Sequence, residues 1–141
     1  MRYLVLFFSL IMISCNNSKS TDNSLKDFDL VGNYEVISMA EIEDEVIADK
    51  NLSINFKADG KVNGNNSCNN YGGDYKVEQN KLSFGMMMST RRFCQETAEI
   101  EATFMQNLTE VDGFKIQEQV LILLRGNTHV IEAKKVSNKD D

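Results

Sequence analysis

Two cysteines and a single histidine are the residues of this chain with the clearest potential for chemistry. Cys68 or Cys94 could pair with His129 as a Cys–His nucleophile, in which the imidazole takes the thiol proton. The same three side chains could also supply three of the four ligands of a zinc ion. The chain has no C-x-x-C spacing and no second histidine to complete either site. We therefore predict no enzymatic activity, no metal and no other cofactor.

The N-terminal sequence "MRYLVLFFSLIMISCNN" predicts where the chain resides. Arg2 precedes an apolar run that is shorter than the roughly 20 residues needed to span a bilayer, which is typical of a secretory signal. The run ends in Met-Ile-Ser-Cys, which resembles a bacterial lipobox. Residues 1–14 are thus the expected lipoprotein signal peptide, with Cys15 as the lipid attachment site for palmitate and related acyl chains. Several acyl chains would hold the protein stably on a membrane.

The residues that follow Cys15 are polar and predict a flexible tether over residues 15–28. Asn16 stands where some bacteria place an aspartate that retains lipoproteins in the inner membrane. The expected location is therefore the bacterial cell envelope, lipid-anchored at the outer membrane.

That location bears on the two remaining cysteines. Paired cysteines outside the cytoplasm usually form a disulfide, so Cys68 and Cys94 are expected to form a structural one. Two buried free thiols, or a reactive or metal-binding cysteine, remain open alternatives from the residues alone.

Composition narrows the possible partners. The chain carries 15 basic and 21 acidic residues, for a net charge of −6, so nucleic acid is not an expected partner. Its length is that of one domain, which we expect to be a monomer. The acidic residues from Glu41 to Glu45 lack the Asp-x-Asp-x-Asp-Gly pattern of a calcium loop and predict a solvated loop.

The stretch "GMMMSTRR" is the most unusual part of the sequence. In a strand, Met86 and Met88 would pack inward and Met87 would be exposed. Methionine is also used on adaptable binding surfaces. The candidate surface for an envelope protein partner is Met86, Met87, Met88, Arg91 and Arg92. Binding of Cu(I) by the thioethers is a further alternative.

Short segments of alternating hydrophobicity surround these residues. The pattern predicts strands at residues 30–39, 51–57, 61–65, 71–78, 81–85, 113–117, 120–126 and 129–136. In the first, Tyr34, Val36 and Ser38 share one side. Asp59-Gly60 predicts a tight hairpin turn.

One segment has a different periodicity. Ile100, Phe104, Leu108 and Val111 recur at helical spacing and predict an amphipathic helix over about residues 95–110. The predicted fold is mainly β with one helix. It is a small antiparallel, partly closed β-barrel-like sheet of about seven or eight strands, with the helix packed against it.

Several of these pieces together resemble the META domain family, similar to HslJ-type heat-inducible lipoproteins. "INFKADGKVNGNNSCNNYGGDYKV" resembles the family's F-x-x-D-G turn followed by G-C-N and a Gly-Tyr strand, and "KLSFGMMMSTRRFC" resembles its strand followed by T-x-x-x-C. The motif residues are Phe56, Asp59, Gly60, Gly64, Cys68, Asn69, Gly73, Tyr75, Thr90 and Cys94. Ser67 stands where the family usually has glycine, and Tyr34 where it often has tryptophan. The resemblance implies a META-like domain over residues 29–136, followed by a disordered tail at 137–141.

The resemblance carries an association with envelope stress and drug tolerance rather than a chemistry. The expected function is that of a non-enzymatic envelope lipoprotein that binds or supports other envelope components in stress tolerance. The alternative is a barrel-like carrier of a small apolar ligand.

Overall fold

The computed structural model describes residues 30–79 and 81–137. This part of the chain is mainly β, as predicted, with a single helix longer than one turn. Its strands are β1 (Gly32–Met39), β2 (Ser53–Phe56), β3 (Lys61–Asn65), β4 (Asn70–Glu78), β5 (Lys81–Phe84), β6 (Met88–Ser89), β7 (Gly113–Gln117), β8 (Val120–Arg125) and β9 (Thr128–Val136). Its helices are α1 (Asp44–Ile47), the 3-10 turn η2 (Gln95–Thr97) and α2 (Ala98–Thr109).

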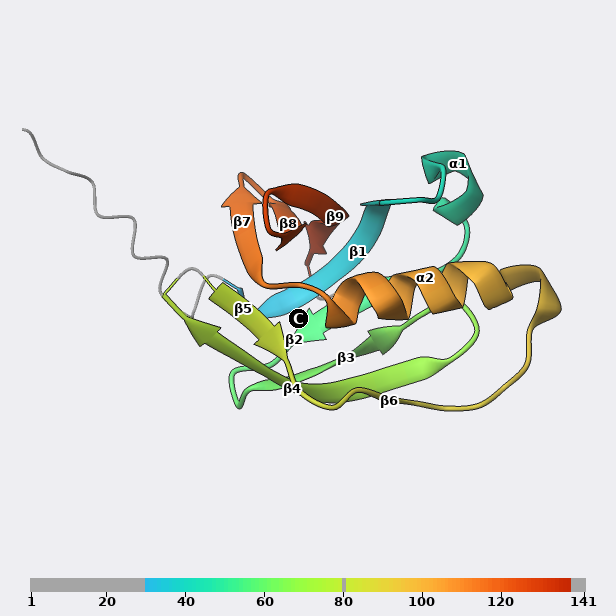
Figure 1. Cartoon of the computed structure of the whole chain (residues 1–141), viewed down its shortest axis with the longest axis horizontal. Helices are drawn as coiled ribbons and strands as arrows, with labels where there is room; N and C mark the ends of the chain where they lie inside the picture. Colours follow the sequence, from blue (N-terminus) through green and yellow to red (C-terminus); the bar gives the residue numbers. More distant parts are fainter. Residues whose placement is uncertain (1–29, 80, 138–141) are drawn as a thin grey trace, which may run out of the picture.

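All nine strands of the described part form one antiparallel sheet. Its order is β5-β4-β3-β2-β1-β9-β8-β7, with the two-residue β6 also paired with β4. The sheet curls until its end strands, β5 and β7, come close together, and α2 lies across its open side (Figure 1). The predicted partly closed barrel is therefore confirmed. The described part has nine strands instead of the predicted seven or eight. The additional strand, β6, was not predicted because it is too short to show an alternating pattern.

The strand at β2 and its hairpin follow from local sequence. Leu52, Ile54 and Phe56 are buried, as their alternation predicts. Gly60 has a φ of +79°, and the Asp59 carboxylate accepts a hydrogen bond from the Lys61 N–H at 3.2 Å. The Asp-Gly pair therefore forms the predicted turn, because glycine adopts positive φ without a steric cost.

The first strand departs from its predicted alternation. Tyr34 and Val36 face the core, but the pairing of β1 with β9 shifts register between Val36 and Ser38. This β-bulge turns Met39, rather than Ser38, into the core. A bulge depends on the partner strand, so the alternation along β1 alone could not locate it.

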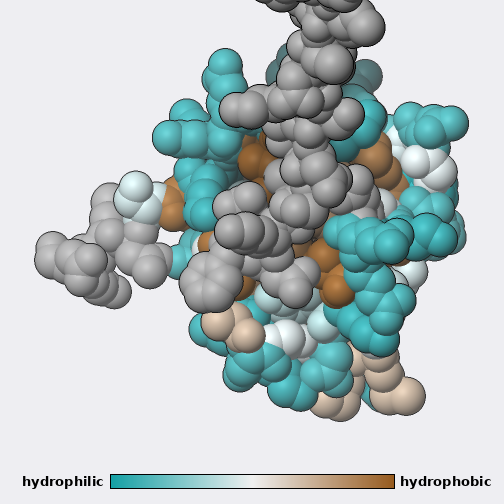
Figure 2. Space-filling view, turned by 90° about the vertical axis from the view of Figure 1, so that its left-hand side faces the viewer, coloured by the Kyte–Doolittle hydropathy of each residue, from teal (hydrophilic) through white to brown (hydrophobic). Residues whose placement is uncertain are grey.

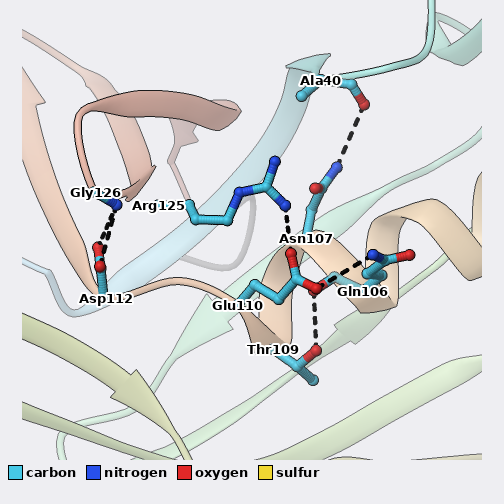
Figure 3. A network of polar contacts seen from close by, with 8 residues as sticks. All are labelled: Ala40, Gln106, Asn107, Thr109, Glu110, Asp112, Arg125 and Gly126. Atoms are coloured by element: carbon cyan, nitrogen blue, oxygen red, sulfur yellow. Dashed lines mark hydrogen bonds and ion pairs between the residues drawn. The ribbon is translucent and has the colours of Figure 1, made fainter.

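The helix follows its predicted stripe. Ile100, Phe104, Leu108 and Val111 are all buried. Three side-chain contacts fix the C-terminal end of α2 and the residues after it to the sheet (Figure 3). Arg125 pairs with Glu110, Asn107 donates to the Ala40 carbonyl at 3.3 Å, and Asp112 accepts from the Gly126 N–H at 2.9 Å. The hydrogen bond from Arg125 lowers the pKa of Glu110.

The concave side of the sheet is filled with large side chains. Phe56 packs against Tyr75 and Phe84 at ring-centroid distances of 5.0 and 6.0 Å, and Phe104 packs against Tyr71 at 5.5 Å. Leu82, Leu121 and Leu123 are among the fully buried residues of the same core. This packing takes the space that an apolar ligand would need, so it argues against the carrier alternative.

Closure of the sheet is incomplete on one face. Figure 2 shows the face on the left of Figure 1, where hydrophobic residues reach the surface between hydrophilic ones. β5 and β7 contribute Phe84 and Ile116, which are only half-buried although they pack against the core. Hydrophobic side chains therefore stay partly exposed where the two end strands fail to pair.

One tyrosine hydroxyl holds the sheet together where β2 and β3 separate. Tyr71 is buried, and its hydroxyl donates a hydrogen bond to the Ser53 carbonyl at 2.8 Å. A Cβ at Gly64 would lie 2.0 Å from the same carbonyl oxygen, so glycine is required there. Burial raises the pKa of Tyr71, because the phenolate would lose its hydration.

This raised pKa predicts a loss of stability at alkaline pH. Above about pH 10 the unfolded tyrosine ionises while the folded one stays neutral, so the Tyr71 contribution is complete below pH 10 and falls as pH rises. At pH 8, Tyr71→Phe should cost about 1–2 kcal/mol, because the Ser53 carbonyl loses its partner. Urea unfolding of the wild type and the variant should show a smaller difference in the free energy of unfolding at pH 11 than at pH 8. An equal difference at the two pH values would contradict the prediction.

Candidate binding site

The structure joins Cys68, in the turn between β3 and β4, to Cys94, which precedes η2. Their Cα atoms lie 6.0 Å apart, across a sequence separation of 26 residues. The disulfide leaves neither thiol available as a nucleophile or a thiolate ligand. His129 lies on β9, with its Nδ1 3.1 Å from a carboxylate oxygen of Glu132. Within residues 30–79 and 81–137, no group of three or more His, Cys, Asp or Glu side chains could hold a metal ion.

Residues 85–94, here called the strap, connect β5 to η2 along the edge of β4. Met88 and Ser89 of β6 pair with Gly72 and Tyr71. The Thr90 N–H then donates to the Asn70 carbonyl at 3.0 Å. Beyond this pairing, the strap is held by side chains rather than by a β ladder.

Asn69 is the centre of that attachment, and its side chain is buried. Its carboxamide oxygen accepts hydrogen bonds from the Thr90 hydroxyl at 2.7 Å and the Arg92 N–H at 2.8 Å. Its carboxamide nitrogen donates to the Arg92 carbonyl at 3.0 Å and to Glu101 of α2 at 2.7 Å. One amide thus pins the strap backbone to the helix, and no other side chain of this size could supply both donors and acceptors in one plane.

Asn66 also contributes to the attachment of Asn69 and Glu101. It is also buried, and its nitrogen donates to Glu101 at 3.2 Å while its oxygen accepts from the Asn69 N–H at 2.9 Å. Asn69 belongs to the segment Ser67-Cys68-Asn69 that resembles the family's G-C-N motif, but its burial was not predicted. Asparagine is common in turns, and turn propensity alone does not separate a solvated side chain from a buried one.

The methionines of the strap face opposite to the predicted alternation. Met86 and Met88 are 85% and 70% exposed, while Met87 packs against the core, so the inward prediction for Met86 and Met88 is wrong. The reason lies in β4. A Cβ at Gly73 would lie 2.5 Å from the Met87 sulfur, so the missing side chain of Gly73 provides the space that Met87 fills.

The two arginines have different surroundings. The Arg92 guanidinium turns back and donates to the Cys68 carbonyl, through Nε at 3.1 Å and also through Nη2. Arg91 is exposed. Phe93, which is not among the predicted surface residues, is 84% exposed. The only sequence signal for the exposure of Phe93 was its position as a lone aromatic residue in an otherwise polar stretch.

The candidate surface therefore has an outer and a supporting part. Met86, Met88, Arg91 and Phe93 face solvent, whereas Met87 and Arg92 hold the strap in place. A hollow of about 760 Å³ lies beside them, with Asn69 and Glu101 in its lining. Such an arrangement of apolar side chains on a fixed backbone can bind another surface, but it brings together no catalytic pair.

The turn before the disulfide carries strain. Ser67 has a φ of +90°, a region that favours glycine.

Ser67→Gly should therefore raise the free energy of unfolding by about 1 kcal/mol. Urea unfolding of the two proteins tests this. Ser83→Gly, in the regular strand β5, is the matched control and should lower stability by about 0.5–1 kcal/mol. A loss of stability at both positions would show that Ser67 is not strained.

The fold and this surface define a small half-barrel protein with a helix across its open side and a disulfide-pinned strap. The chain belongs to the META domain family, whose model matches residues 28–138. The resemblance seen in the sequence is thereby confirmed. No curated protein matches the chain.

Three solved structures show the same fold. An NMR structure of a protein from Burkholderia xenovorans is 21% identical, with a TM-score of 0.59 over 76% of this chain and 83% of that one. A second NMR structure is 20% identical, with a TM-score of 0.57 over 74% and 88%. The crystal structure of a DUF4847 family protein from Bacteroides vulgatus is 16% identical, with a TM-score of 0.52 over 77% and 94%. At these identities the likeness concerns the fold alone.

Proposed function

We propose that this META domain protein is a non-enzymatic lipoprotein of the cell envelope, which binds or supports another envelope protein under stress. The observation that carries the proposal is the strap, which exposes Met86, Met88 and Phe93 to solvent from a backbone held by buried hydrogen bonds.

The fixed backbone matters for binding energy. A loop that is already ordered loses little conformational entropy when a partner docks, so more of the contact energy appears as affinity. Methionine and phenylalanine supply large apolar contacts, and Arg91 beside them adds a charge for orientation. The other exposed large hydrophobics of the described part, Ile37, Val46 and Val136, are each less than half exposed.

The membrane anchor rests on the sequence, because Cys15 lies outside the described residues. No helix in the described part of the chain is long and apolar enough to cross a membrane. Metabolic labelling with palmitate should mark the wild-type protein and fail to mark Cys15→Ser. Labelling that survives the substitution would contradict the anchor.

The binding proposal is tested in the full-length, anchored protein. A photo-crosslinking amino acid at Phe93 should give a discrete protein adduct in stressed cells. The same residue at Glu45, on the exposed helix α1 away from the strap (Figure 1), should not. The double substitution Met86→Ser and Met88→Ser should reduce the adduct. Equal adducts at both positions, or none at Phe93, would contradict a docking role for the strap.

A further inference from the structure

The outer face of β1, β2 and β3 carries a row of asparagine side chains. Asn33 pairs directly with Asn55, and Asn55 pairs directly with Asn63, so the three residues lie on one line across the sheet. Their strand neighbours Ile54 and Val62 are buried in the core. Since side chains alternate along a strand, the three carboxamides point away from the core.

A second polar row runs beside the first. Asn65 pairs with Asn70, its Nδ2 donates to the Asn70 carboxamide oxygen at 3.1 Å, and its N–H donates to the Ser53 hydroxyl at 3.1 Å. Two hollows of about 270 and 410 Å³ lie along the rows and share Ser53, Asn55 and Asn65 in their linings. The two hollows therefore adjoin and form one shallow depression, which Asn55, Asn63, Asn65 and Asn70 line and Asn33 does not.

The lining of this depression is almost uncharged. Of the residues that line the two hollows, Glu35 alone is charged, although 26% of the chain is Asp, Glu, Lys or Arg. Asn55 Nδ2 donates to Asn63 Oδ1 at 3.2 Å. This bond leaves Asn55 Oδ1 as an acceptor and Asn63 Nδ2 as a donor for an outside group. A hydroxyl group, which both donates and accepts, can bond to both groups at once, whereas an ion of either sign is attracted to only one of them.

The spacing of the row also fits a chain ligand. Neighbouring strands lie about 4.8 Å apart, so Asn33, Asn55 and Asn63 place one asparagine on each strand at steps of that length. This step is close to the length of one pyranose residue in an extended, β-1,4-linked glycan. The row continues to Gly72, which adds no side chain, and then to Met88 at its end. The Met88 thioether gives the apolar face of a sugar a surface to contact.

We propose that the asparagine face, meaning Asn33, Asn55 and Asn63 with Ser53, Asn65 and Asn70, binds a neutral, extended, β-1,4-linked glycan chain. The site is separate from the partner surface on the strap, apart from Met88 at their border. Tyr34 and Tyr71, the aromatic residues in the linings, are buried, so no ring is available for stacking on a sugar. The affinity for a single chain is consequently low, with a Kd on the order of 1 mM, and rises with chain length.

The test is an NMR titration of the chain from residue 16 onward, which retains every described residue. Chitohexaose, a β-1,4-linked hexamer of N-acetylglucosamine, is the probe. It should shift the side-chain NH2 signals of Asn33, Asn55 and Asn63 and leave that of Asn127, in the exposed β8–β9 turn, unchanged. Maltohexaose, an α-linked chain with a helical shape, should shift them less. No shift at about 10 mM chitohexaose, or equal shifts with maltohexaose, would overturn the proposal.

A matched pair of variants completes the test. Asn55→Ala with Asn63→Ala should weaken chitohexaose binding at least about fivefold, since two hydrogen-bonding groups are lost. Asn127→Ala should bind as the wild type does. If the double variant unfolds, Asn63→Thr retains strand propensity and removes the same donor. Unchanged affinity in a folded Asn63 variant would overturn the proposal.

Discussion

Replacing Asn69 with alanine should lower the free energy of unfolding by about 3 kcal/mol, a large effect for one uncharged side chain. The substitution removes four hydrogen bonds at once. It leaves the N–H and carbonyl groups of Arg92, in the strap, without the Asn69 side chain as their partner. It also removes the shortest hydrogen bond of Glu101. The measurement is urea unfolding of the chain from residue 16 onward.

A matched control is available at the next residue. Asn70 is exposed, and its side chain makes one hydrogen bond, with Asn65, so Asn70→Ala should cost less than about 1 kcal/mol. A second readout concerns the strap itself. Trypsin should cleave after Arg91 and Arg92 faster in Asn69→Ala than in Asn70→Ala. Equal stability losses and equal cleavage rates would show that Asn69 is not the attachment point.

Removing the disulfide should lower the free energy of unfolding by about 3.5 kcal/mol, which is the chain-entropy value for a closed loop of this length. Cys68 and Cys94 have a sequence separation of 26. Cys68→Ser, Cys94→Ser and the double variant should all lose the same amount, because each breaks the same bond.

A thiol count by intact mass tests the bond directly. Alkylation of the native chain from residue 16 onward should add no label, and alkylation after reduction should add two. Two labels on the unreduced, folded protein would mean free thiols and would reopen the reactive-cysteine and metal-binding alternatives. Unequal losses in the two single variants would show that one cysteine has a role besides the bond.

Much of the scaffold could be predicted because its signals are local. The alternation in β2, the Asp59-Gly60 turn and the stripe from Ile100 to Val111 are each readable within one segment, and each was confirmed. The stretch predicted as a candidate surface does expose Met86, Met88 and Arg91 to solvent. The direction of the methionine side chains could not be predicted from this stretch alone. Met87 faces inward because Gly73, in another strand, leaves room for it.

The sequence by itself determined the fold class, the META resemblance and the expectation that Cys68 and Cys94 pair. These depend on periodicity, motif order and residue type, which are properties of short segments. Only the tertiary structure decided that Asn69 is buried, that Arg92 turns back to Cys68 and that Phe93 is exposed. The alignment of Asn33 with Asn55 and Asn63 belongs to the same class. The asparagine alignment is set by the register between strands, and the placement of Asn69 and Arg92 by hydrogen bonds between the strap and the turn before β4. Both are long-range properties that no single segment encodes.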